Sequence, residues 1–268
     1  MKKWVSLGIM VLLLSFAYFP TIVWMVDRWS AKDSYYGHGF LILPVTLYLL
    51  WRKKDELAAI RPSPSLWGLM CLLTGLVIHL VSAIIKVYFT SAFSILLSVA
   101  GLVLFLWGKR MLRAVAFPVA FLFFMVPFPL VVIGTTTVRL KLFAAMCAIR
   151  VLHAIGFPAL QEGSMIYMKN AAVAVEDPCS GLRSLLSLLT LGVLFAYLKQ
   201  APFPRRVVFF LSSIPIALLA NIIRIVLLAV IADIYGIEAA LKFFHDFSGF
   251  LVFALALGGL SAVGRILK

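Results

Sequence analysis

The stretch PIALLANIIRIVLLAVIA, residues 215–232, is an apolar run that contains one arginine, Arg224. Its length approaches the roughly 20 apolar residues that a helix needs to cross a bilayer. The rest of the chain shares this character, because 64% of its 268 residues are hydrophobic and its mean hydropathy is +1.11. Soluble domains contain about 45–50% apolar residues. The excess predicts a polytopic membrane protein.

Similar apolar runs recur along the chain and predict an all-α membrane bundle of about eight transmembrane helices, because isolated segments in lipid must satisfy their backbone hydrogen bonds as helices. The N-terminal run has a basic start, but no small-residue cleavage site follows it, so we expect a retained first span. Residues 1–268 are expected to form a single integral-membrane domain. The expected spans lie at about residues 4–25, 39–51, 66–85, 90–108, 114–133, 182–198, 207–231 and 247–264.

The net charge of +14 is concentrated in short connectors between the apolar runs. These connectors are MKK, WRKKDELAAIR, GKRMLR, KQAPFPRR and GRILK, and they fall at alternate ends of the expected spans. The positive-inside rule assigns them to the cytoplasm, with both termini. A nucleic-acid-binding protein would instead gather its basic residues on one face of a domain, so we expect no nucleic-acid partner.

The segment 134–181 is the least membrane-like part of the chain and is expected to be extracytoplasmic. Its first part, TTTVRLKLFAAMCAIRVLHAIG, mixes basic and apolar residues and predicts an amphipathic helix in the membrane interface. Its second part, EGSMIYMKNAAVAVE, contains two short runs that flank Lys169-Asn170 and predict a small β-hairpin. The hairpin leads to Cys179.

The stretch VEDPCSGLRSLLSLL, residues 175–189, predicts a helix start. Asp177 suits the N-cap and Pro178 the first helical position. Cys179 would then lie in the first turn, where the helix dipole lowers a thiol pKa. Ser180 and Gly181 are small and would leave room for a peptide. A small residue that merely caps a helix is the structural alternative.

The other cysteines, Cys71 and Cys147, are expected to pack among apolar residues. The three cysteines of the chain have neither metal-site spacing nor a disulfide pattern, and we expect no metal or cofactor.

Two arginines accompany the candidate thiol. Arg183 follows Cys179 by four residues, so it would share its helix face or reach the headgroups. Arg224 lies about 17 residues into the seventh span, roughly 25 Å from its cytoplasmic side. Burying arginine there costs at least ~2.5–3.5 kcal/mol, so such residues usually face a partner or a wet cavity. Asn221 could orient Arg224, and Glu176 or Asp177 could pair with it in a structural salt bridge.

His245 precedes the eighth span in FFHDFSGFLVF, where Asp246 or Ser248 could cap the helix. Histidine is the usual proton carrier near neutral pH. His38, in YYGHGF, is a rival base or a substrate contact, whereas His79 is expected to pack within its span. A Cys–His pair is typical of thiol nucleophiles in acyl transfer, and a nearby arginine stabilises thiolate or oxyanion charge.

Several short motifs follow one another along the chain in a characteristic order. They are YYGHGFLILPVTLYLLWRKK, then the predicted hairpin, then CSGLRSL, NIIRI and HDFSG. In this respect the chain resembles the exosortase/archaeosortase family of membrane cysteine (thiol) proteases and transpeptidases. The resemblance implies a catalytic triad of Cys179, Arg224 and His245 and places Arg183 on a motif position. Members often have Glu-Ala-Cys before Ser-Gly, whereas this chain has Glu176-Asp177-Pro178-Cys179, a difference that concerns the subfamily and its substrate motif.

The resemblance also implies the substrates, which are secreted proteins with a C-terminal sorting signal of the PEP-CTERM type. Such a signal comprises a short motif, a transmembrane helix and a basic tail. We therefore expect cleavage at the outer face of the cytoplasmic (inner) membrane, with release to water or to an amine-bearing surface acceptor. The alternatives are a small membrane transporter that uses Arg224 as an anion site, and a polysaccharide-export assembly factor.

Overall fold

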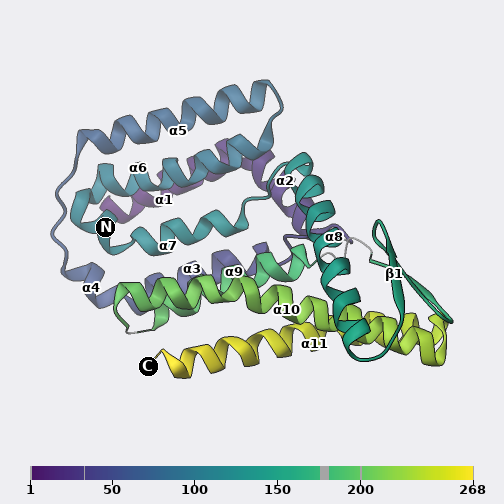
Figure 1. The fold of residues 1–268 in the computed structure, drawn as a ribbon. Coiled ribbons are helices and arrows are strands. Elements are labelled where there is room, and N and C mark those ends of the chain that lie inside the picture. Colours follow the sequence, from purple (N-terminus) through teal and green to yellow (C-terminus); the bar gives the residue numbers. More distant parts are fainter. Residues whose placement is uncertain (1, 33, 176–180, 200, 268) are drawn as a thin grey trace. The chain divides into compact units, whose positions relative to one another are not determined.

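The computed structural model describes residues 2–32, 34–175, 181–199 and 201–267. The chain forms two compact units, Met1–Pro129 and Leu130–Lys268. Almost every described element is a helix, and a small sheet occurs in the second unit (Figure 1). The predicted class, an all-α polytopic membrane bundle, is confirmed; the single-domain expectation stays a prediction.

The first unit is a set of helices in which α5 and α6 form a tight antiparallel pair. Gly68 and Gly101 lie against the backbone of the opposite helix, at Phe105 and Leu72 respectively, and leave no room for a Cβ atom. Small residues allow this close approach, which is the main source of packing between helices in lipid. The helices of this unit are α1 (Lys2–Ala17), α2 (Phe19–Ser30), α3 (Gly39–Arg52), α4 (Lys54–Ala59), α5 (Leu66–Ile84), α6 (Tyr88–Ala114), α7 (Ala116–Phe121) and the 3-10 helix η1 (Leu122–Met125).

A kink separates α1 from α2, whose axes differ by 68°. Pro20 explains the break, because it lacks an N–H group for the turn before it and its ring displaces that turn. The ring of His79 on α5 compensates at this point: its Nε2 donates to the carbonyl oxygen of Ala17 at 3.0 Å, and its Nδ1 lies 2.7 Å from Oγ of Ser91. The prediction that His79 packs within the bundle is confirmed, since it is 8% exposed.

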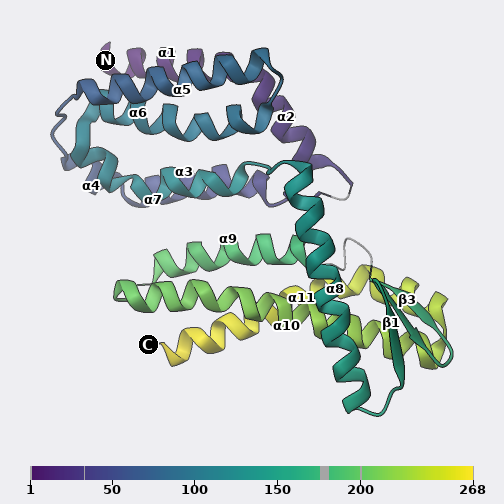
Figure 2. The same ribbon diagram turned by 45° about the horizontal axis from the view of Figure 1, so that its top comes forward.

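The second unit comprises α8 (Leu130–Ala154), strands β1 (Ala159–Glu162), β2 (Met165–Met168) and β3 (Ala172–Ala174), and helices α9 (Leu182–Leu198), α10 (Phe203–Tyr235) and α11 (Ile237–Ile266). Helices α9, α10 and α11 run alongside one another, and α8 crosses them steeply (Figure 2). The strands form an antiparallel sheet in the order β1-β2-β3. The predicted hairpin around Lys169-Asn170 is confirmed as β2 and β3, and β1 adds a strand that was not expected.

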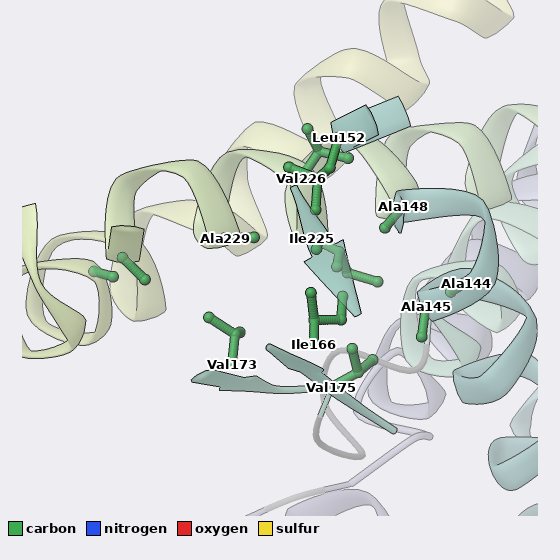
Figure 3. Packing of buried hydrophobic residues seen from close by; sticks show 13 residues of the cluster. Ala144, Ala145, Ala148, Leu152, Ile166, Val173, Val175, Ile225, Val226 and Ala229 are labelled. Carbon is green, nitrogen blue, oxygen red and sulfur yellow. The ribbon is translucent and has the colours of Figure 1, made fainter. Parts of the chain in front are cut away.

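One face of the sheet packs on the helices. Ile166 and Val173 of the sheet lie beside Ile225 and Ala229 of α10, and Ala145 of α8 closes the same cluster (Figure 3). These side chains are almost fully buried. Because the alternate residues of a strand point to opposite faces, the other face of this small sheet is left outward.

The expected number of spans is not confirmed. In the described residues, five helices are long and apolar enough to cross a membrane, or six if α1 and α2 count as one bent span. The expected spans 39–51 and 182–198 correspond to the shorter helices α3 and α9. The expected span 114–133 is wrong as one helix: it is divided among α7, η1 and the start of α8, because Pro127 and Pro129 interrupt helical hydrogen bonding.

The expected interfacial helix appears as α8, and it begins at Leu130. By length and composition α8 could itself cross a membrane. Its course across α9 and α10 (Figure 2) fits a helix that lies along the membrane surface when those two helices cross it. Its place relative to the membrane stays a prediction.

Candidate functional site

Helix α9 begins later than the sequence suggested. Its first residue is Leu182, and Gly181 before it has the left-handed angles φ 81° and ψ −7°. A right-handed helix cannot continue through this conformation, so α9 does not extend back to the predicted start at Asp177 and Pro178, which lie outside the described residues.

The segment that holds the candidate nucleophile lies outside the described residues. It comprises Glu176, Asp177, Pro178, Cys179 and Ser180. The roles expected for Cys179, Glu176 and Ser180 therefore stay predictions, as does the proposed triad.

Gly181, at the described end of this segment, lies directly against α10. A Cβ atom on Gly181 would be 3.0 Å from both Cγ and Nδ2 of Asn221. Asn221 is 1% exposed, and the Gly181 carbonyl accepts a hydrogen bond of 2.9 Å from Oγ of Ser184. The CSGLR and NIIRI segments therefore meet at this contact.

Arg224 lies three residues after Asn221 on the uninterrupted helix α10 and is partly buried. At 1.5 Å per residue it is roughly 31 Å from the first residue of α10 and roughly 17 Å from the last. Arg183, the second residue of α9, is also partly buried.

His245 lies inside a helix rather than in front of one. Helix α11 begins at Ile237, directly after Gly236, whose φ is 88°. The prediction that Asp246 or Ser248 caps a helix is therefore wrong, because the strong helix formers in IEAALKFF carry the helix back to Gly236.

The packing of α10 and α11 sets the level of His245 relative to Arg224. A Cβ atom placed on Gly259 of α11 would lie 3.0 Å from the side chain of Ile216 on α10. A Cβ atom on Gly264 would lie 3.4 Å from the side chain of Phe209. Continuing this antiparallel register at 1.5 Å per residue puts the backbone of His245 about one to two helical turns from the level of Arg224. The Gly181–Asn221 contact is within about one turn of Arg224.

His38 belongs to the first unit, where it directly precedes α3. Burial lowers its pKa below 6.5, and a hydrogen bond to the backbone carbonyl of Phe124 opposes this shift in part. Its ring is tilted against that of Tyr36, with 5.9 Å between centroids. His38 is therefore mostly neutral at pH 7, as a base or a hydrogen-bond donor would be.

One anchor of the hairpin was not predicted from the sequence. The backbone N–H of Asn170 donates to Oδ1 of Asp233 at 2.8 Å, and Nδ2 of Asn170 donates to the Asp233 carbonyl at 3.3 Å. This pair ties the β2–β3 turn to the end of α10. The sequence feature that could have indicated this anchor is Asp233 itself, an acidic residue near the end of an apolar span.

Other candidate ligands are dispersed. Cys71 and Cys147 are partly buried free thiols. Across the described ranges, no group of three or more His, Cys, Asp or Glu side chains gathers as it would around a metal ion.

Comparison with known proteins identifies the family. A model of the transmembrane exosortase family matches residues 24–262, which include parts of both compact units. No curated protein and no solved structure gives a match. Because the family model covers most of the chain, the chain belongs to the transmembrane exosortase family.

Proposed function

We propose that this exosortase is a cysteine peptidase and transpeptidase that cleaves the C-terminal sorting signals of exported proteins. Cys179 is the nucleophile, His245 the proton carrier and Arg224 the group that stabilises negative charge. Arg183, Asn221 and Gly181 support the site. The reaction occurs at the outer face of the cytoplasmic membrane.

The observation that carries this proposal is the contact of Gly181 with Asn221. Gly181 is two residues from Cys179 in the chain, and Asn221 is three residues from Arg224. Antiparallel packing brings the backbone of His245 within about two turns of the same level. Gly181, the Asn221–Arg224 turn of α10 and the first half of α11 all belong to the second unit, and this arrangement supports a Cys–Arg–His site there.

The chemistry is a two-step acyl transfer. The Cys179 thiolate attacks the carbonyl carbon of the scissile peptide bond, and Arg224 compensates the charge on the resulting oxyanion. The C–N bond then breaks, His245 protonates the leaving amine, and a thioester remains on Cys179. Water or an acceptor amine attacks this thioester, giving an acid or a new amide and returning the proton to the thiol.

Charge supports the outward orientation of this site. Lys199 donates from Nζ to the carbonyl of Gly264 at 2.6 Å, so the α9–α10 connection and the end of α11 lie together. Arg205, Arg206 and Arg265 are near this end in sequence, and a basic end faces the cytoplasm by the positive-inside rule. Gly181 and Arg224 are toward the opposite end of the same helices.

The test is processing of a co-expressed protein that carries a motif, a transmembrane helix and a basic tail. Cys179→Ala and Cys179→Ser should abolish cleavage, because neither supplies a thiolate, whereas Cys71→Ala and Cys147→Ala should leave it intact. Normal cleavage by Cys179→Ala would overturn the proposal. A silent Cys179→Ser beside an inactive Arg224→Ala in a transport assay would favour an anion transporter instead.

A further inference from the structure

The two edges of the small sheet differ in what lies beside them. At the β1 edge, Nε2 of His153 lies 2.8 Å from the carbonyl oxygen of Ala159 and 3.3 Å from its nitrogen. Nε2 of Gln161 donates to the carbonyl of Leu142 at 3.4 Å. Helix α8 therefore covers the β1 edge with side chains and backbone.

The β3 edge is open within the described part of the chain. The Val175 N–H bonds to Ser164 and the Met168 N–H to Ala171, so the odd-numbered residues of β3 face β2 in the antiparallel ladder. The backbone N–H and C=O groups of Ala172 and Ala174 point the other way, and no described residue hydrogen-bonds to them.

The side chains of β3 also leave this edge accessible. Val173 is buried against the helices, whereas Ala172 and Ala174 are exposed methyl groups. An unpaired edge with small side chains is a ready template for an added strand. Because the Asn170–Asp233 bonds hold the turn before β3 to α10, the strand is presented on a fixed support.

We infer that β3 is the docking strand for the substrate, which binds as an extended peptide by main-chain hydrogen bonds to Ala172 and Ala174. This inference rests on the proposed peptidase function, since the occupant is the segment to be cleaved. Cys179 follows Ala174 by five residues, so only a short length of chain separates the docking strand from the proposed nucleophile. Backbone pairing fixes the depth of the peptide, and side-chain contacts elsewhere select its motif.

The first experiment removes the outward N–H groups without touching the β2–β3 ladder. Ala172→Pro and Ala174→Pro do this, because proline is tolerated at outward-facing edge positions. The matched controls, Ala172→Val and Ala174→Val, add similar bulk and keep the N–H. With a synthetic peptide that spans the cleavage site, each proline should raise KM about two- to tenfold with little change in kcat. Equal KM values for the proline and valine variants would overturn the inference.

The second experiment uses the unaltered protein and needs no folded variant. Single N-methyl groups are placed along the same peptide, and competition for cleavage is measured. Strand addition requires that inhibition is lost at alternate residues, because alternate N–H groups face β3. A uniform or irregular profile would overturn it. If only the docking inference is wrong, Cys179→Ala will still be inactive. If the proposed peptidase function is wrong, Cys179→Ala will remain active.

Discussion

Gly181 and Asn221 show how much a single residue pair contributes to this site. Gly181 has a positive φ that only glycine adopts without strain, and it faces a fully buried amide. The pair therefore fixes both the direction in which the chain enters α9 and its spacing from α10.

We expect Gly181→Ala to destabilise the protein by about 1–2 kcal/mol from the left-handed backbone, with a further cost from the contact with Asn221. This should lower Tm by several degrees and slow alkylation of Cys179 by iodoacetamide. In the double variant Gly181→Ala/Asn221→Ala, the part of the destabilisation that comes from the contact should disappear, and the part that comes from the left-handed backbone should remain. Thermal unfolding in detergent would measure both. If adding Asn221→Ala to Gly181→Ala restores no stability at all, the two residues do not interact.

His38 carries a pH dependence of stability. Its pKa is lower in the folded protein than its ordinary value of 6.5, chiefly because of burial. The unfolded chain therefore takes up the proton first as pH falls, so the contribution of His38 is complete above about 6.5 and is lost as pH falls through the folded pKa. Thermal unfolding from pH 7.5 to 5 should show a smaller loss for His38→Gln than for the wild-type protein. Parallel curves would contradict the shift.

At the scale of elements, the kinked pair α1–α2 depends on a polar network that spans α2, α5 and α6. The hydroxyl of Tyr18 lies 2.7 Å from Oγ of Ser94 and 2.9 Å from Oγ of Ser98, and the Thr21 hydroxyl lies 2.6 Å from Oγ of Ser91. His79 joins the same network at Ser91. In lipid such bonds serve to hold helices in register, because no water replaces them.

Removing the imidazole of His79 should lower the stability of the first unit. His79→Leu keeps the apolar volume and leaves the Ala17 carbonyl without its donor, at a cost of about 1–3 kcal/mol. His79→Gln retains a donor and should lose less, as thermal unfolding in detergent would show. Equal unfolding temperatures for His79→Leu and the wild-type protein would mean that the kink does not depend on this bond.

At the scale of the whole molecule, the charge distribution predicts the membrane topology. In a protein without its native cysteines, Ala58→Cys in α4 should react with an impermeant maleimide only after the cells are opened. Lys169→Cys in the β2–β3 turn should react in intact spheroplasts, because that turn is expected outside. The reverse pattern would invert the orientation proposed for the site.

Hydropathy alone determined much of this protein. Apolar runs of span length must become helices in lipid, and the all-α class follows from that constraint. The alternating pattern around Lys169-Asn170 was sufficient to predict a hairpin, since its turn residues and short β-prone runs act locally. The family resemblance rested on short motifs that are visible without coordinates.

The tertiary structure decided where the elements begin, break and meet. Asp177-Pro178 is a good local helix start, yet α9 begins at Leu182 after the left-handed Gly181. The fifth expected span is divided near Pro127 and Pro129, and α11 extends back to Ile237. Local propensity contributes tenths of a kcal/mol to about 1 kcal/mol per residue, which packing between helices overrides. The meeting of Gly181 and Asn221 depends on that packing, and a linear pattern of residue types does not encode it.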